Sequence, residues 1–332
     1  MNSWTLEDYM KSLQIALQVL YISPKERIYP VALKSTMCPT EDLKAKGARI
    51  EDHYGSPTRR KLVAYMHSVV SFSSGKGGVG KTNIVANTAI ALAKMGRRPL
   101  IFDADLGLAN IDVLLGLAPK YNIKHVLSGD CGMKEIIVKG PNGILILPAS
   151  SGVPELLDLT EAQKRLLLDE MDSLGETIDT LLIDTAAGIS DTVLYFNVAS
   201  FHRIVVVTPE PTSITDAYAL IKVLHSRHKV DSFCILVNMA SSEQEAKKVY
   251  SQLAQVADRF LGPLRMIYLG FIPKDHNLQK AVLQQRAVLD MYPEAPSSVA
   301  FLRLAQRLAE LDRDTRADGN IKFFWRDFLE MH

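Results

Sequence analysis

The glycine-rich segment SGKGGVGKT at residues 74–82 constrains the fold more than any other part of the sequence. It follows a β-prone run at 69–73 and precedes an apolar pattern of helical spacing at 84–93. Between a strand and a helix, the spacing G-x-x-x-x-G-K-T is typical of a loop whose backbone amides hold a phosphate group. We expect the Lys81 ammonium to contact the β- and γ-phosphates of a nucleotide, and the Thr82 hydroxyl to bind Mg²⁺. The segment therefore predicts a nucleoside triphosphate site on an α/β fold.

Alternating strand-like and helical stretches follow this loop. Several strand-like runs are continuous in Val, Ile and Leu, which is typical of strands covered on both faces. Helical stretches between such strands make βαβ units, so we predict a single doubly wound, mostly parallel sheet. The expected strands are 69–73, 99–102, 144–147, 180–183, 204–207, 234–237 and 266–271. Ligands of such sheets bind at the carboxyl ends of the strands, so the reactive side chains should follow those ends.

Acidic residues close two of the predicted strands. Asp103 and Asp105 end the second strand, and their i, i+2 spacing places both side chains on one side of an extended chain. Asp184 ends the fourth strand after the run LLI, which is the Walker B pattern of a carboxylate near Mg²⁺. Beside a magnesium-bound nucleotide, a carboxylate can orient an attacking water or hold the hydration shell of the ion. These residues therefore predict a site for phosphoryl hydrolysis.

A later strand end suits the base of the nucleotide. Asn238 follows the strand at 234–237, and its amide offers both a donor and an acceptor, as the edge of adenine requires. The pattern N/T-K-x-D, which would indicate guanine, is missing at this position. Taken alone, Asn238 is better explained as an ordinary turn residue; together with the other motifs, it favours a contact with adenine.

A second lysine, Lys76, stands inside the glycine run. With it, the segment KGGVGKT resembles the deviant Walker A motif of the MinD/ParA class of ATPases. The resemblance implies an ATP-dependent homodimer in which Lys76 reaches the nucleotide of the partner subunit. It implies ATP contacts from the loop residues Gly75, Lys76, Gly77, Gly78, Val79, Gly80, Lys81, Thr82 and Asn83.

The same resemblance assigns roles outside the loop. Asp105 is implied to position the attacking water, and Asp103 to support Mg²⁺ beside Thr82 and Asp184. Asn238 is implied to contact adenine. The segment GFIPKD at 270–275 resembles the loop that closes over the base, which implies contacts from Pro273 and Asp275.

One branch of the class fits best. The run DADLGLANIDVLLG at 103–116, the triplet KTN at 81–83 and the aromatic C-terminal segment resemble the flagellar-number regulators FlhG, FleN and YlxH. That branch implies a slow, Mg²⁺-dependent, dimer-activated ATPase that limits the number or placement of flagella at the membrane. It implies two partners, the signal-recognition-type GTPase FlhF and, in some bacteria, a flagellar transcription activator. The D-Q-A-x-x-L-R motif that activates this GTPase is missing from residues 1–66, so the resemblance does not extend that activity to this N-terminus.

Four alternative functions can be weighed against the sequence. A cell-division ATPase of MinD type would share the ATPase and the tail, and differs in the character of 103–116. A ParA-type DNA-partitioning ATPase would need a basic surface, whereas the net charge is +1, so we expect no specific nucleic-acid partner. An iron–sulfur carrier needs a cysteine pair, and Cys38, Cys131 and Cys234 stand far apart. A non-enzymatic scaffold would lack Lys81, Thr82 or Asp105, and all three are present.

The sequence also gives an expected location. No apolar run reaches the ~20 residues of a membrane-spanning helix, and the start of the chain shows no signal-peptide pattern. The scattered cysteines fit a reducing compartment. We therefore expect a cytoplasmic protein that binds reversibly to the inner face of the cell membrane.

We divide the chain into four parts. Residues 1–66 form an N-terminal extension with one amphipathic helix and a polar tether, and 67–312 form the ATPase domain. Residues 313–319 form a polar linker, and 320–332 form an amphipathic helix. Its apolar residues share one face, which suits a helix lying in a membrane interface; docking onto the ATPase domain is the alternative. These residues are Ile321, Phe324, Trp325, Phe328 and Leu329.

Overall fold

The computed structural model describes residues 68–105, 111–148 and 177–317, with residues 160, 162, 163, 166, 169, 170 and 174 between them. All of these belong to one unit of the chain, Thr58–His332. The predicted N-terminal extension, the 106–110 part of the acidic segment and the C-terminal amphipathic helix lie outside the described residues.

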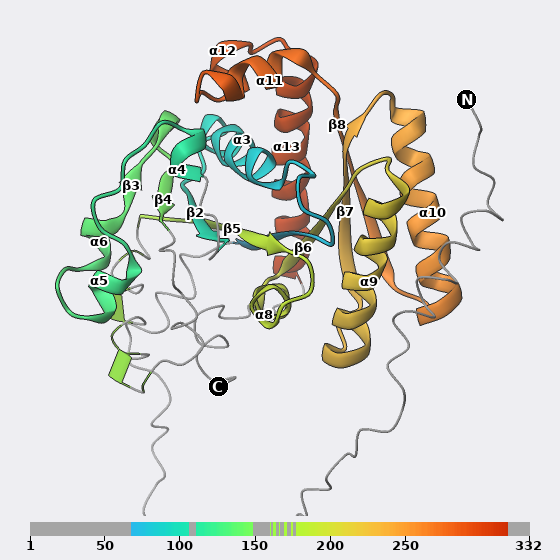
Figure 1. Cartoon of the computed structure of the whole chain (residues 1–332), viewed down its shortest axis with the longest axis horizontal. Coiled ribbons are helices and arrows are strands. Elements are labelled where there is room, and N and C mark those ends of the chain that lie inside the picture. Colours follow the sequence, from blue (N-terminus) through green and yellow to red (C-terminus); the bar gives the residue numbers. More distant parts are fainter. Residues whose placement is uncertain are drawn as a thin grey trace, which may run out of the picture. The chain divides into compact units, whose positions relative to one another are not determined.

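One sheet organises the domain, with the strand order β3-β4-β2-β5-β1-β6-β7-β8 (Figure 1). Neighbouring strands are parallel except for β3 and β4. This confirms the predicted doubly wound, mostly parallel fold. The strands are β1 (Ser68–Ser74), β2 (Pro99–Ala104), β3 (Val138–Lys139), β4 (Leu145–Leu147), β5 (Thr180–Ala187), β6 (His202–Val207), β7 (Ser232–Ala240) and β8 (Arg265–Pro273).

Strand β1 shows why continuous apolar runs predict such a sheet. All seven of its residues are buried, and consecutive side chains point to opposite faces. Val70 and Phe72 enter one apolar cluster, while Val69 enters the other. Since β1 pairs with β5 on one side and β6 on the other, both faces and both edges of this strand are covered.

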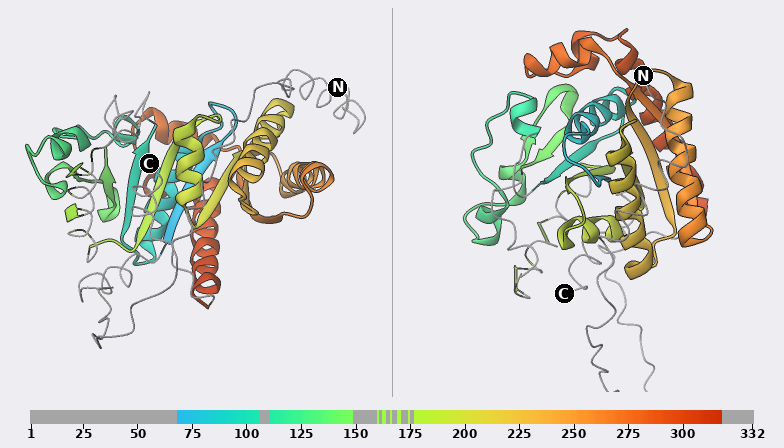
Figure 2. Two further views of the ribbon diagram at one scale, coloured as in Figure 1. Left: turned by 90° about the horizontal axis from the view of Figure 1, so that it is seen from below. Right: turned by 45° about the vertical axis from the view of Figure 1, so that its right-hand side comes forward.

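Helices cover the two faces of the sheet (Figure 2). Helices α3 and α13 pack together on one face, with α12 beside them. Helices α8 and α9 lie on the other face, where α10 packs against α9, β7 and β8. The helices are α3 (Lys81–Lys94), α4 (Ile111–Leu114), α5 (Ile123–Leu127), α6 (Met133–Ile136), the 3₁₀ turn η1 (Pro141–Gly143), α8 (Asp191–Ala199), α9 (Pro211–His228), α10 (Glu243–Leu261), α11 (His276–Leu283), α12 (Val288–Met291) and α13 (Pro296–Ala317). No helix among the described residues is both long enough and apolar enough to cross a bilayer.

Helix α13 continues further than the sequence predicted. A polar linker was expected from residue 313, but the helix runs to Ala317. Asp312 helps to fix this end, because its carboxylate accepts a hydrogen bond from Arg97 at 3.1 Å and pairs with His202 at 3.3 Å. The polar composition of residues 313–317 therefore did not indicate where the helix ends.

Candidate nucleotide-binding site

The phosphate loop connects the end of β1 at Ser74 to the start of α3 at Lys81. Gly80 lies at the N-cap of α3 with a φ of 86°, a conformation that L side chains rarely adopt. Gly75 lies against α9, because a Cβ placed on it would come 2.1 Å from the carbonyl carbon of Asp216. The first turn of α3 carries no acidic residue, so its amides and positive dipole end are suited to a phosphate.

Lys81 and Asp184 meet under this loop. The Lys81 side chain is 8% exposed, that of Asp184 is 1% exposed, and Nζ lies 3.2 Å from Oδ1. Burial raises the pKa of Asp184, against the opposing effect of the Lys81 charge and of a hydrogen bond with Thr82. The structure therefore brings together three residues that the sequence placed at the phosphates and the metal.

Asp103 and Asp105 lie at the neighbouring strand end. Asp103 is in register with Asp184 across β2 and β5. Its Oδ1 accepts a hydrogen bond from the Asp105 amide at 3.2 Å, and its Oδ2 accepts one from the Ile111 amide at 3.3 Å. The negative charge of Asp105 contributes to the raised pKa of Asp184, so Asp105 lies near the same site. Asp103 thus holds both ends of the loop after β2, which the sequence did not predict.

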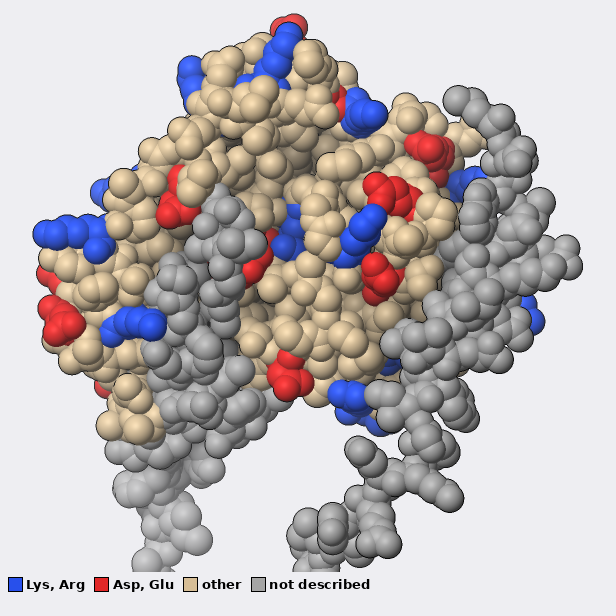
Figure 3. Space-filling model, viewed as in Figure 1, with Lys and Arg blue, Asp and Glu red and all other residues tan. Residues whose placement is uncertain are grey.

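The additional lysine of the loop has partners in its own chain. Lys76 forms an ion pair with Glu210, at the N-cap of α9, and its Nζ donates to the Thr212 hydroxyl at 3.1 Å. The two charged side chains are 38% and 59% exposed. A pair this exposed contributes about 0–1 kcal/mol. Figure 3 shows basic and acidic side chains side by side near the middle of this face.

The residues expected at the base lie at the ends of β7 and β8. Asn238 is buried, and its Nδ2 donates to the Val79 carbonyl at 2.7 Å. Pro273 is the last residue of β8. Asp275 caps α11 by accepting from the Asn277 amide at 2.8 Å, and it accepts from the Ser297 hydroxyl at 2.7 Å. Asn238 therefore fixes the phosphate loop, and Asp275 fixes the turn after β8, two structural tasks beyond those expected from the sequence.

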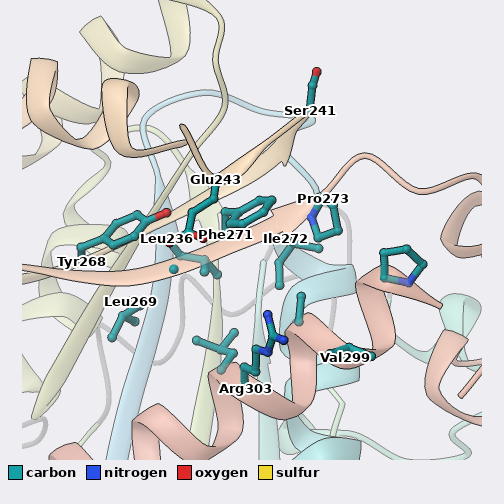
Figure 4. Close-up of a pocket in the computed structure, with 14 residues that line it drawn as sticks. Leu236, Ser241, Glu243, Tyr268, Leu269, Phe271, Ile272, Pro273, Val299 and Arg303 are labelled. Atoms are coloured by element: carbon teal, nitrogen blue, oxygen red, sulfur yellow. The ribbon is translucent and has the colours of Figure 1, made fainter. Parts of the chain in front are cut away.

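A pocket of about 480 Å³ lies beside β8 (Figure 4). Leu236, Ile272 and Leu304 contribute to its apolar lining, while Glu243 from α10 and Arg303 from α13 face each other across it. Pro273 lies at its rim, but no residue of the phosphate loop lines it. The pocket is therefore adjacent to the expected base position and separate from the phosphate site.

A buried polar network behind the loop was not predicted. Asn197 on α8 donates to the Ser73 hydroxyl at 2.7 Å, and Ser73 shares a hydrogen bond of 3.1 Å with Thr185, which follows Asp184. Thr185 also donates to the Phe72 carbonyl at 3.0 Å. The serines in an otherwise apolar β1 were the available signal, because a buried hydroxyl needs a partner. This network ties the strand before the phosphate loop to the strand that carries Asp184.

The side chains present fit a magnesium ion. Mg²⁺ binds proteins through one or two oxygen ligands and takes its remaining ligands from phosphates and water. Thr82 at the start of α3 offers a hydroxyl, and Asp184 on β5, which forms a hydrogen bond with it, offers a carboxylate. A cation here would also offset the unfavourable burial of the Asp184 carboxylate.

Solved structures of similar fold are known. The MinD subunit of a MinC:MinD complex from Aquifex aeolicus has a TM-score of 0.60 and 28% identity, and the match covers 73% of this chain and 96% of that one. MinD of Pyrococcus horikoshii complexed with Mg-ADP has a TM-score of 0.58 and 26% identity, with 74% and 96% covered.

Curated relatives are more similar in sequence. "Antiactivator FleN" of Pseudomonas aeruginosa is 43% identical over 266 residues, which cover 80% of this chain and 95% of that protein. "Flagellum site-determining protein YlxH" of Helicobacter pylori is 35% identical over 263 residues, which cover 77% and 88%. The family model described as the CobQ/CobB/MinD/ParA nucleotide binding domain matches residues 70–288. The chain belongs to the MinD/ParA family of nucleotide-binding proteins.

Proposed function

We propose that this chain is an ATP-hydrolysing, nucleotide-switched dimeric regulator of flagellum number or placement that binds reversibly to the membrane. The observation that carries the proposal is the similarity to antiactivator FleN, at 43% identity over 95% of that protein. The flagellar role in the name of the Helicobacter pylori relative supports the same function.

The chemistry proposed for the site is positioning and charge stabilisation. Transfer of a phosphoryl group to water requires an oriented water molecule and cations around the γ-phosphate. Lys81 supplies one cation when its ammonium turns from Asp184 to the phosphates, and Asp105 orients the water. Thr82, Asp103 and Asp184 would hold Mg²⁺, which would supply positive charge beside the phosphate oxygens.

Lys76 is proposed to act on the nucleotide of the partner subunit. Its pairing with Glu210 supports this, because an exposed ion pair holds the ammonium at the loop surface at little energetic cost. A phosphate group carries more negative charge than one carboxylate and can replace Glu210 as the partner. In this proposal Lys76 pairs with Glu210 in the single chain and exchanges this partner for the phosphate group on dimerisation.

Adenine is proposed as the base. The Asn238 amide nitrogen is engaged by Val79, and its carbonyl oxygen is suited to accept from the exocyclic amine of adenine. The fixed turn at Pro273 and Asp275 would cover the base from the other side. The remaining phosphate-loop contacts come from residues 75–83.

Membrane binding and partners follow from the tail and the relatives. The apolar face of the segment 320–332 is proposed to lie in the membrane interface, on the cytoplasmic side. Two copies in an ATP dimer would raise avidity about 100-fold or more over one. FlhF and a flagellar transcription activator are the proposed partners, and the word "antiactivator" in the name of FleN favours the second.

Replacing Asp105 tests the catalytic assignment. Asp105→Ala should bind ATP as the wild type does and lose hydrolysis by about 100-fold, which is the usual contribution of one positioned base or orienting group. Fluorescent-nucleotide titration and phosphate release measure the two properties. Hydrolysis at the wild-type rate would remove Asp105 from the mechanism.

Deleting the gene tests the biological role. Cells without the protein should carry extra or misplaced flagella and divide normally, and the wild-type gene should restore the count. Electron microscopy of flagella and light microscopy of division septa separate the outcomes. Minicells with normal flagella would favour the cell-division alternative.

A further inference from the structure

The two ends of the sheet differ in charge. The carboxyl ends of the strands carry the phosphate site, where Asp103, Asp105, Asp184, Glu210 and Asp275 gather. The opposite end, where the parallel strands begin, is called here the amino edge. Strands β1, β2, β6 and β8 begin there at Ser68, Pro99, His202 and Arg265.

Basic side chains gather at one half of the amino edge. Helix α9 ends at this half of the edge, where Arg227 and the C-cap residue Lys229 are exposed. Helix α10 also ends here, and Arg259 in its last turn is exposed. Arg265 at the start of β8 is also exposed. Phe260 is 46% exposed, with the Arg259 guanidinium 5.6 Å from its ring centre. Basic side chains are visible at the lower end of α9 in Figure 3.

The other half of the amino edge has a basic hollow. A pocket of about 420 Å³ is lined by Arg98, Lys134 and Lys139 around the apolar side chains of Ile137 and Leu145. Both lysines are exposed and have no ion-pair partner among the described residues. Exposed acidic side chains also lie along this edge, among them Glu135, Asp231 and Asp258, and Glu310 near the end of α13.

Helix α13 ends between the two halves. Asp312, in its last turns, contacts Arg97 before β2 and His202 at the start of β6. The chain therefore leaves the domain in the middle of the amino edge, and the amphipathic segment 320–332 follows. The nucleotide site lies at the opposite end of the same sheet.

We infer that the amino edge is a lipid-facing surface that binds the anionic headgroups of a bilayer beside the C-terminal segment. The inference rests on the proposed membrane association and adds a second contact to it. A short amphipathic helix with few basic residues binds a bilayer weakly, and stable peripheral binding generally needs a second signal. Basic side chains near an anionic surface supply that signal. Their electrostatic attraction to the surface is largely screened by salt at distances beyond the Debye length. Because α13 ends at the amino edge, a bilayer bound by the segment that follows α13 would lie within about one Debye length of the basic side chains.

Charge-neutralised variants test the inference in the full-length chain. One variant carries Arg259→Gln and Arg265→Gln, and another carries Lys134→Gln and Lys139→Gln. The matched control carries Lys247→Gln and Lys248→Gln, which remove the same charge from the part of α10 nearer the phosphate site. Each protein is sedimented with Mg-ATP and vesicles of phosphatidylcholine, with or without phosphatidylglycerol.

Each amino-edge variant should bind the anionic vesicles roughly 5- to 25-fold more weakly than the control, at about fivefold per charge in contact. The difference should disappear near 1 M salt, where the Debye length falls to ~3 Å. If the wild type fails to sediment with either vesicle, the proposed membrane association fails as well. If it sediments but the edge variants match the control, only the inference is overturned. Loss of binding to duplex DNA with unchanged vesicle binding would also overturn it, because the edge would then be a nucleic-acid surface.

Discussion

The contact between Gly75 and α9 predicts a specific failure on adding one methyl group. In Gly75→Ala, the new Cβ would lie 2.1 Å from the Asp216 carbonyl carbon and oxygen and 2.6 Å from its Cβ. Backbone atoms of a helix cannot turn aside as a side chain can, so the loop and α9 must separate by more than an ångström to reach ordinary contact. Overpacking of this kind costs about 1–3 kcal/mol, and the backbone contact places this case in the upper half of that range.

Gly77→Ala is the matched control for this prediction. A Cβ on Gly77 meets nothing within 4 Å, and Gly77 is not among the glycines with a left-handed φ. Its stability without nucleotide should stay within about 0.5 kcal/mol of the wild type, the usual range for substitutions away from special contacts. Both substitutions make the same chemical change two residues apart in one loop.

Urea unfolding without nucleotide measures the difference. Gly75→Ala should lower the midpoint by roughly 1 M, given about 2–3 kcal/mol and a slope of about 2–3 kcal/mol per molar urea. Gly77→Ala should leave the midpoint nearly unchanged. Equal midpoints for the two variants would refute the close approach of the loop to α9.

Two further perturbations have expected results. Asn238→Ala should lower stability by about 1–2 kcal/mol without nucleotide, because the buried Val79 carbonyl loses its donor; unchanged urea unfolding would leave Asn238 with a nucleotide role alone. For Asp312, burial opposes ionisation, but hydrogen bonds from His202 and Ser68 and the charges of His202 and Arg97 hold its pKa below its ordinary value. Because its pKa is lower in the folded protein than in the unfolded chain, the Asp312 carboxylate stabilises the fold at pH values above its unfolded pKa. This stabilisation is lost as the pH falls through the folded pKa. Asp312→Asn should therefore cost about 2 kcal/mol near neutral pH and progressively less below about pH 4. A difference that stays constant from pH 7 to about pH 3 would contradict this account.

The strands and the glycine-rich loop between β1 and α3 could be predicted because their signals are local. Each buried parallel strand is a continuous apolar run, and the loop at 74–82 combines glycines, Lys81 and Thr82 within a few residues. The edge strand β3 has only two residues, too few for any periodic pattern. Its antiparallel pairing with β4 was missed for that reason.

Contacts between distant segments could not be predicted. Lys76 and Glu210 are 134 residues apart, and Arg97 and Asp312 are 215 apart. Nothing in the local sequence of either partner indicates the other, because the pairing depends on which helix returns to which strand end. The loop-holding roles of Asp103 and Asn238 were missed for the same reason, although both residues were correctly expected at the edge that carries the phosphate loop.

We expect ATP to join two copies of this chain through a contact in which Lys76 takes part. Light scattering of the full-length Asp105→Ala protein, which should hold ATP without hydrolysing it, tests this most directly. With Mg-ATP its mass should be twice the 36.8 kDa of one chain, and with Mg-ADP it should be that of one chain. Adding Lys76→Ala should return the ATP sample to a single chain. A mass of one chain with ATP, or an ATP dimer that persists unchanged without the Lys76 ammonium, would contradict the account.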